Sequence, residues 1–283
     1  ARIMITWGII SSGFMFTDDI YWGSIASLFN CTDAEFTFYV FRFLLGACEA
    51  GFFPGIILYL TYWFPGSRRT KVIALFMTAI AISNVIGAPV SGAIMQYMQG
   101  MGGLRGWEWL FLLEGIPSVI VGCLVFVFLP DGPRHAPWLD EREKEFIIQE
   151  VKLDDAAKDE LGKGHSLWDA FSDYRVWCLA LVYFSGVICF YAINFWMPTI
   201  IQELGIDKKD FFKVGLLSMI PWGISAVFMV LWGAHSDKTG ERRWHVAGAL
   251  LIGVTGLIGL ALVGHAPIPS LIALTLVASG MLA

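Results

Sequence analysis

Long apolar segments with very few charges constrain the fold of this chain more than any other feature. A helix needs about 20 mainly apolar residues to cross about 30 Å of hydrocarbon. Eight segments approach or exceed that length, namely 3–17, 38–64, 71–97, 108–130, 174–203, 212–234, 244–264 and 268–283. The stretch 20–37 is too polar and broken to span, and is expected to form a long loop. The sequence therefore predicts an all-α protein that crosses the lipid bilayer several times.

The composition excludes other classes of protein. Of the 283 residues, 57% are hydrophobic and only 15% are charged, whereas a soluble domain carries about 25% charged residues. This balance argues against a soluble enzyme. The formal net charge of −5 argues against a nucleic-acid-binding protein, because such a protein needs a basic face.

The cysteines indicate no metal site or disulfide, and the chain ends indicate a fragment. Five cysteines are present, and none of them has metal-ligand spacing. We therefore expect no metal site, no cofactor and no disulfide framework. The chain begins at Ala1 without a recognisable signal peptide and stops inside an apolar run. These ends indicate a piece of a longer protein.

A polar stretch divides the apolar segments into two groups of four. Residues 131–173 contain a charged run from Asp140 to Lys163, and Asp140 and Lys144 have the i,i+4 spacing of a solvated helix. We expect a helical half at 1–130, a linker at 131–173 and a second helical half at 174–283. A connecting helix without chemistry is the plainest interpretation of the linker.

The loop charges predict the orientation of the chain in the membrane. Alternating the loops between the two sides places 14 of the 19 Lys and Arg residues on the side of the linker and 4 on the other, with Arg42 inside a span. Because cytoplasmic loops carry an excess of Lys and Arg, the linker is expected in the cytoplasm and the protein in the cell membrane.

A glycine-rich basic motif follows the sixth segment. It contains Gly233, Asp237, Gly240, Arg242 and Arg243 in the pattern G-x-x-x-D-[KR]-x-G-x-[KR]-[KR]. The glycines allow a tight turn and close approach of helices, and Asp237 can cap a helix or pair with an arginine. An ordinary basic turn is the alternative.

This motif resembles the signature that major facilitator superfamily transporters carry between the second and third helix of each six-helix half. The resemblance implies the major facilitator fold, with these eight segments as helices 3–10 of 12. The polar linker then falls where the family has its central cytoplasmic loop.

The resemblance narrows in four further blocks. They are the run from Phe41 to Gly55, the run from Tyr59 to Pro65, the run from Trp107 to Pro117, and Phe195-Trp196-Met197-Pro198. The chain is similar to the anion:cation symporter branch, which includes permeases for tartrate, sugar acids, phthalate, hydroxyphenylacetate and allantoate. The 18–37 loop is longer than that branch leads us to expect.

Three charged residues lie well inside predicted spans. They are Arg42, Glu49 and Glu114, and such charges are costly in a membrane. Arg42 and Glu49 are two helical turns apart on one face, about 10 Å along the axis. The resemblance implies that Glu49 couples transport to protons and that Arg42 attracts the anionic substrate. The alternatives are a structural carboxyl at Glu49 and an ion pair between Arg42 and Glu114.

Weaker candidates for substrate binding lie in two other spans. Asn84 precedes a run of small residues that indicates close helix packing. Tyr191 and Asn194 share a helix face just before Pro198. The alternative for this pair is an interhelical hydrogen bond beside an interfacial aromatic residue.

Together these features favour a monomeric secondary transporter, not an enzyme, that moves a small organic anion with a proton by alternating access. An uncoupled uniporter or a transporter-like sensor is the alternative function. A membrane-embedded enzyme would need clustered His, Asp or Cys in the spans, and the sequence has none.

Overall fold

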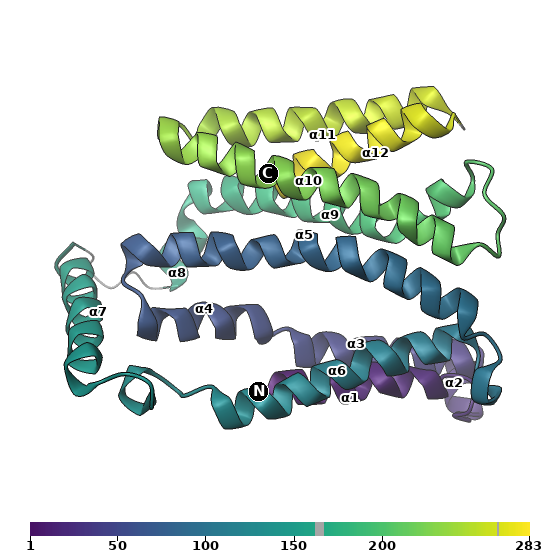
Figure 1. The fold of residues 1–283 in the computed structure, drawn as a ribbon, viewed down its shortest axis with the longest axis horizontal. Helices are drawn as coiled ribbons and strands as arrows, with labels where there is room; N and C mark the ends of the chain where they lie inside the picture. Colours follow the sequence, from purple (N-terminus) through teal and green to yellow (C-terminus); the bar gives the residue numbers. More distant parts are fainter. Residues whose placement is uncertain (162–166, 265) are drawn as a thin grey trace. The chain divides into compact units, whose positions relative to one another are not determined.

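The computed structural model describes residues 1–161, 167–264 and 266–283, and all regular structure within them is helical (Figure 1). Its longer helices are α1 (Arg2–Gly13), α3 (Asp33–Glu49), α4 (Phe52–Trp63), α5 (Gly66–Tyr97), α6 (Gly106–Phe128), α7 (Glu141–Leu161), α9 (Tyr174–Gln202), α10 (Phe211–Thr239), α11 (Arg243–Val263) and α12 (Pro267–Leu282). Short elements are η1 (Phe14–Phe16), α2 (Ser24–Leu28), η2 (Met101–Gly103), η3 (Pro133–His135) and α8 (Leu167–Ser172). The expected all-α class is confirmed.

The apolar helices follow the eight predicted segments. Within the described residues, six helical stretches are long and apolar enough to cross a membrane: Asp33–Trp63, Lys71–Tyr97, Gly106–Phe128, Tyr174–Gln202, Phe211–Thr239 and Arg243–Val263. Two shorter apolar helices, Arg2–Phe16 and Pro267–Leu282, occupy the first and last predicted segments.

Contacts divide the chain into two compact units. The first contains Ala1–Ile73 and Tyr97–Lys163, and the second contains Ala74–Gln96 and Gly164–Ala283. Most of α5 therefore clusters with the helices that follow the linker. The predicted boundary between two halves at residue 130 stays a prediction.

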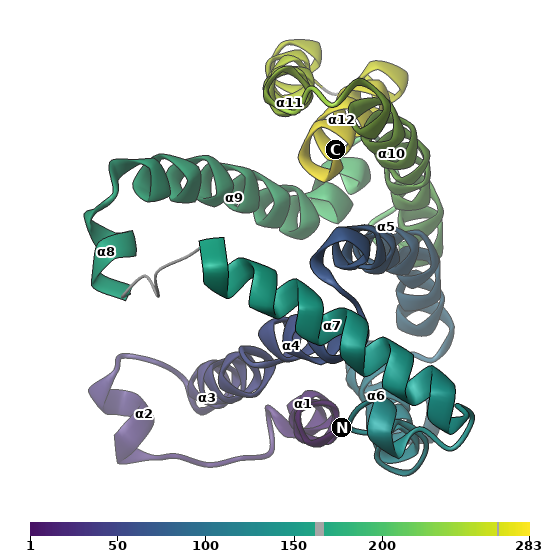
Figure 2. The same ribbon diagram turned by 90° about the vertical axis from the view of Figure 1, so that its left-hand side faces the viewer.

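In the first unit, α1 packs against α6 and α3 (Figures 1 and 2). Glycines make the α1–α6 contact close: a Cβ on Gly8 would lie 2.8 Å from the Gly115 carbonyl oxygen, and one on Gly122 would lie 2.7 Å from Ile5. Phe14, at the end of α1, is fully buried and stacks on Phe111 of α6 with ring centroids 4.8 Å apart.

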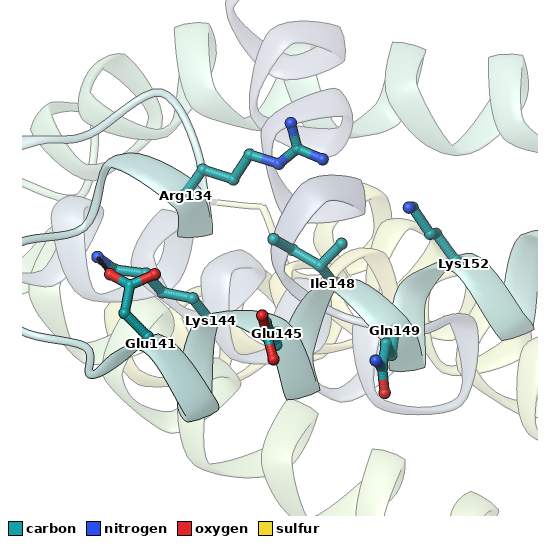
Figure 3. Close-up of a pocket in the computed structure, with 7 residues that line it drawn as sticks. All are labelled: Arg134, Glu141, Lys144, Glu145, Ile148, Gln149 and Lys152. Atoms are coloured by element: carbon teal, nitrogen blue, oxygen red, sulfur yellow. Dashed lines mark hydrogen bonds and ion pairs between the residues drawn. The ribbon is translucent and has the colours of Figure 1, made fainter.

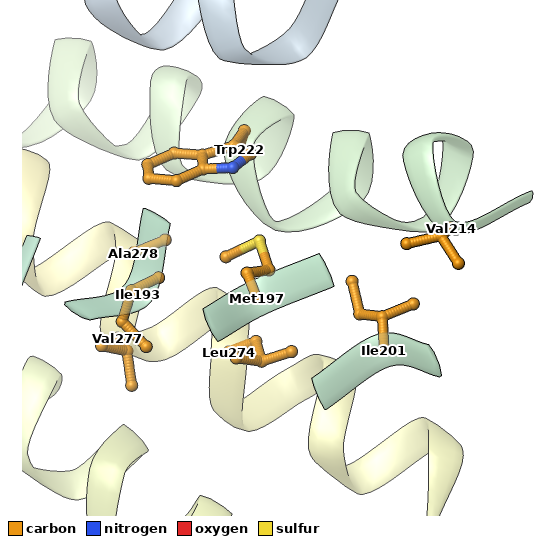
Figure 4. Packing of buried hydrophobic residues seen from close by; sticks show 8 residues of the cluster. All are labelled: Ile193, Met197, Ile201, Val214, Trp222, Leu274, Val277 and Ala278. Atoms are coloured by element: carbon orange, nitrogen blue, oxygen red, sulfur yellow. The ribbon is translucent and has the colours of Figure 1, made fainter. Parts of the chain in front are cut away.

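In the second unit, a hydrophobic core joins α9, α10 and α12. In Figure 4, Met197 of α9 lies between Trp222 of α10 and Leu274 of α12. The buried members of this core are Ile193, Met197, Ile201, Val214, Trp222, Leu274, Val277 and Ala278. A buried hydrogen bond of 3.0 Å between the hydroxyls of Ser225 and Ser279 joins α10 to α12.

The prediction of a continuous loop over 20–37 is wrong. The stretch contains the short helix α2, and α3 already begins at Asp33. A capping box starts α3 early: Thr32 Oγ1 accepts from the backbone N–H of Glu35, and Glu35 accepts from the backbone N–H of Thr32. Asp33 Oδ1 also accepts from the N–H groups of Trp22 and Gly23, 3.0 Å each.

The span predicted as one helix over 38–64 is interrupted. Figure 1 shows α3 and α4 as two separate helices, and the break falls at Ala50 and Gly51. Pro54, in the first turn of α4, has no N–H to donate to the carbonyl four residues earlier. Gly51 and Pro54 are visible in the sequence, but they do not predict a break, because glycine and proline also occur inside continuous membrane helices.

The linker is largely helical, and residues 162–166 of its predicted range lie outside the described residues. Asp140 does not pair with Lys144 as its spacing suggested. It instead caps α7, with its Oδ1 accepting from the backbone N–H of Glu143 at 2.8 Å. Lys144 pairs with Glu141 at 2.8 Å. The cap takes the carboxylate because the first N–H groups of a helix have no intrahelical partner.

The linker also contacts the end of α4 within the first unit. The rings of Trp63 and Trp138 stack with centroids 6.1 Å apart. Tyr59 donates its hydroxyl to the Pro130 carbonyl at 3.1 Å, and the N–H of Gly66 donates to Asp154 Oδ2 at 2.9 Å. These contacts fix the linker to the corner between α4 and α5.

Candidate functional site

Arg42 lies on α3 among aromatic rings. Its guanidinium carbon is 5.3 Å from the centroid of the Phe38 ring and 5.9 Å from that of Phe14. The residue is exposed. Across the part of the chain that the structure describes, neither a carboxylate nor a hydrogen-bond acceptor pairs with the Arg42 guanidinium. Arg42 is therefore a cation on an apolar helix, with no counter-ion among the residues that the structure describes.

Glu49 is the last residue of α3, immediately before the helix break. Its side chain is exposed, and none of the described residues bonds to it. Arg42 and Glu49 lie on the same helix face, about 10 Å apart along the axis. The pair thus presents one positive and one negative group, each with free polar atoms, on one segment.

The ion pair between Arg42 and Glu114, which was the alternative to a substrate role for Arg42, is not found among the described residues. Glu114 lies exposed on α6 and has an interaction of its own, whereas Arg42 contacts Phe38 and Phe14. Two phenyl rings, and not a carboxylate, thus lie against the Arg42 guanidinium within the described residues.

Asn84, Tyr191 and Asn194 belong to the second unit. The amide nitrogen of Asn84 donates to the Ile80 carbonyl at 2.9 Å, and that of Asn194 donates to the Phe190 carbonyl at 2.9 Å. Each amide still has a carbonyl oxygen and a second N–H available. Tyr191 is 54% exposed, and its ring stacks on Phe195. These side chains retain polar atoms that a solute can use.

Most of the basic motif belongs to helix α10, and only its last part forms a turn. α10 continues to Thr239, and Gly240 ends it with φ +69°, a left-handed conformation that favours glycine. Asp237 Oδ1 lies 3.7 Å from Arg242 Nη2, with both side chains exposed. Next to them, His235 Nδ1 and His245 Nε2 are 2.7 Å apart and join the ends of α10 and α11. Gly233 and Arg243 lie on α10 and α11 respectively.

A close contact between α5 and α10 was only partly visible in the sequence. Gln96 Oε1 accepts from the backbone N–H of Phe212 at 2.9 Å, at the start of α10. A Cβ on Gly92 would meet the carbonyl oxygen of Phe211, and one on Gly215 would meet that of Ala88. The run of small residues in α5 indicated close packing, but no sequence signal pointed to Gln96.

At the start of α6, Arg105 forms a cluster with two carboxylates. Its guanidinium lies 2.5 Å from Glu108 and 2.6 Å from Asp18, and it packs on Trp107 at 4.6 Å. Hydrogen bonds raise the pKa of Arg105, the one to Glu108 more than the one to Asp18. Because both carboxylates neutralise it, we interpret Arg105 as a structural residue that joins Asp18 to the start of α6. It contrasts with Arg42, which has no such partner.

An open cavity of about 520 Å³ lies on the linker (Figure 3). It is lined by charges of both signs and by an apolar side chain: Arg134, Glu141, Lys144, Glu145, Ile148, Gln149 and Lys152. The candidate site residues do not line it. Over the described residues, no three His, Cys, Asp or Glu side chains come together in a way that could hold a metal ion.

Comparisons with known proteins agree with this architecture. The family described as Major Facilitator Superfamily matches residues 2–283. An Agrobacterium vitis protein, provisionally named a tartrate transporter, is 45% identical over 282 residues, covering 99% of this chain and 60% of that protein. The Pseudomonas putida protein provisionally named metabolite transport protein NicT is 43% identical over 258 residues, covering 91% and 54%.

Among solved structures, the partially occluded inward-open xylose transporter XylE from Escherichia coli has the same fold. The TM-score is 0.59 at 19% sequence identity, and the match covers 99% of this chain and 65% of that one. The matched part of this chain spans 60% of the length of the A. vitis protein and 54% of that of NicT.

Proposed function

This chain belongs to the major facilitator superfamily, and from that premise we propose that it is part of a carrier that moves small organic anions across the cell membrane by proton symport. The family consists of transporters, which confirms the expectation that the protein is not an enzyme. The observation that carries the proposal is the Arg42–Glu49 pair. Within the part of the chain that the structure describes, this cation has no counter-ion and this carboxylate has no partner, and both lie on one face of one apolar helix.

In this proposal Arg42 receives the carboxylate of the substrate. A guanidinium presents a planar fork of N–H donors that matches a carboxylate, and the Arg42 fork has no acceptor among the described residues. The names of the relatives from A. vitis, which refer to tartrate, support a carboxylate as cargo.

Glu49 is the proposed proton-coupling group. A carboxylate inside a membrane segment costs free energy unless it is paired or protonated. Glu49 has no partner among the described residues, so exchange of a proton with whichever side is open is the chemistry available to it. The break after Glu49 places this carboxylate beside backbone that is not part of a continuous helix.

Asn84, Tyr191 and Asn194 are further substrate-binding residues in this proposal. Their remaining donors and acceptors suit the hydroxyl groups of a hydroxy acid. In this proposal the carrier is a monomer, its linker α7 lies in the cytoplasm, and its two halves rock during transport.

Uptake into membrane vesicles tests the proposal. The full-length protein is expressed, and right-side-out vesicles are given labelled tartrate, galactonate, phthalate or hydroxyphenylacetate with and without an imposed pH gradient. We expect at least one acid to accumulate above equilibrium only with the gradient. Uptake that merely equilibrates would favour an uncoupled uniporter, and uptake of none of the acids would refute organic-anion transport.

A further inference from the structure

The charge of Arg42 is stabilised in an unusual way for a membrane helix. A cation inside a membrane segment normally pairs with a carboxylate or with backbone carbonyls. Outside the spans, at the start of α6, Arg105 pairs in this way with Asp18 and Glu108. Arg42 has neither kind of partner among the described residues. What it has is two phenyl rings, at 5.3 and 5.9 Å from its guanidinium carbon.

The two rings are themselves held in place. Phe38 precedes Arg42 by one helical turn on α3, and its ring meets the Phe14 ring edge to face with centroids 5.5 Å apart. Phe14 is fully buried. Its ring contacts Phe41 of α3 at 5.4 Å and stacks on Phe111 of α6 at 4.8 Å. The aromatic wall behind Arg42 therefore comes from three elements, α3, η1 and α6.

Aromatic faces stabilise a guanidinium without using its hydrogen-bond donors. The attraction arises between the positive charge and the negative face of the ring. The five N–H donors lie in the guanidinium plane, so they remain free for a ligand. A carboxylate in the same position would neutralise the arginine and occupy those donors, as it does in the Arg105 cluster.

We propose that Phe14 and Phe38 are positioning residues that hold Arg42 charged and without a counter-ion, so that its donor fork binds the substrate carboxylate. This inference rests on the proposed function of Arg42. It adds that the strength of carboxylate binding depends on the aromatic character of two side chains that do not touch the substrate.

Substitution of Phe38 gives the sharpest test, because this ring is only half buried. In the full-length carrier, the uptake kinetics are measured with the acid of the four-member panel that the wild type accumulates best. We expect Phe38→Leu to raise KM by about 2- to 30-fold, in line with the strength of cation–π contacts, and to leave kcat unchanged. Phe38→Tyr and Phe38→Trp keep an aromatic face and are expected to retain the wild-type KM within about two-fold.

A matched control separates this effect from a general loss of packing. Phe43 lies on the same helix and is 76% exposed, and no ring contact or cation–π contact of Arg42 involves it. Phe43→Leu is expected to leave KM unchanged. Phe14→Leu is expected to raise KM as Phe38→Leu does, with the amount of folded protein measured by fluorescence-detected size-exclusion chromatography.

The outcomes distinguish this inference from the proposed function. If Arg42→Ala raises KM at least tenfold but Phe38→Leu behaves as wild type, the positioning role is wrong and substrate binding by Arg42 stands. If Phe38→Tyr loses affinity as much as Phe38→Leu, the aromatic face is not the cause, and the inference is again refuted. If Arg42→Ala has the wild-type KM, both are refuted.

Discussion

At the scale of single residues, the carboxylate of Glu49 and the guanidinium of Arg42 are the groups to which we assign the proposed chemistry, and neither has a bonding partner among the described residues. Both groups could be named from the sequence, because charges are rare in apolar segments and seven residues place them on one face. The surroundings of Arg42 could not be named, because Phe14 is 28 positions away and no spacing rule links it to α3.

Neutralising Glu49 gives the prediction that belongs to this scale. Glu49→Gln removes the titratable group but keeps its size, so we expect accumulation driven by a pH gradient to fall to the equilibrium level while exchange of labelled for unlabelled substrate continues. Counterflow and gradient-driven uptake are measured in the same vesicles.

A matched substitution on the same helix serves as the control. Glu35→Gln replaces a carboxylate in the first turn of α3, where glutamine preserves the capping box. Accumulation should be unchanged in this variant. If Glu49→Gln concentrates the substrate as the wild type does, Glu49 has no coupling role.

At the scale of elements, glycines decide how closely helices approach. The α5–α10 contact depends on Gly92 and Gly215, each of which lies against a backbone carbonyl of the other helix. The α11–α12 contact follows the same rule, since a Cβ on Gly256 would lie 2.6 Å from the N–H nitrogen of Val277. Small residues at such positions allow backbones to pack in lipid.

Adding one methyl group to Gly92 tests the α5–α10 contact. Gly92→Ala places a Cβ against the Phe211 carbonyl, and we expect a loss of about 1–3 kcal/mol of stability, the usual cost of overpacking. Thermal unfolding of the purified full-length protein in detergent, followed by size-exclusion chromatography, measures the change.

Gly87→Ala is the control on the same helix. An added Cβ there meets no atom within 4 Å, and alanine favours the helix by about 0.8–1.0 kcal/mol over glycine. The melting temperature of this variant should therefore stay the same or rise. An equal fall in both variants would show that helix α5 does not tolerate alanine for a reason other than this contact.

At the scale of the whole molecule, the linker connects two groups of membrane helices and is fixed to the first unit. Trp138 stacks on Trp63, and Asp154 accepts from the N–H of Gly66. The excess of Lys and Arg on the linker side predicts that this side faces the cytoplasm.

Cysteine labelling tests the orientation of the linker. In a full-length protein without native cysteines, Leu153→Cys, at a position that is 70% exposed on α7, is expected to react with a membrane-impermeant maleimide in inside-out vesicles only. Lys208→Cys, in the exposed turn after α9, is expected to react in right-side-out vesicles only. The reverse pattern would invert the predicted topology.

Several elements were predictable because their signals are local. The membrane spans, their order and the linker follow from the length of apolar runs and from a charged stretch. The starts and breaks of helices were less predictable. The early start of α3 depends on a capping box at Thr32 and Glu35. The break before Pro54 was not predictable, because continuous membrane helices also contain glycine and proline.

An all-helical membrane protein, and the charges that lie in its spans, could be predicted from the sequence, because hydrophobic length and charge are properties of consecutive residues. How the helices pack brings Arg42 against Phe14, and Gln96 against the start of α10. These contacts join residues distant in the chain, and they depend on how helices pack against one another, which no local pattern encodes.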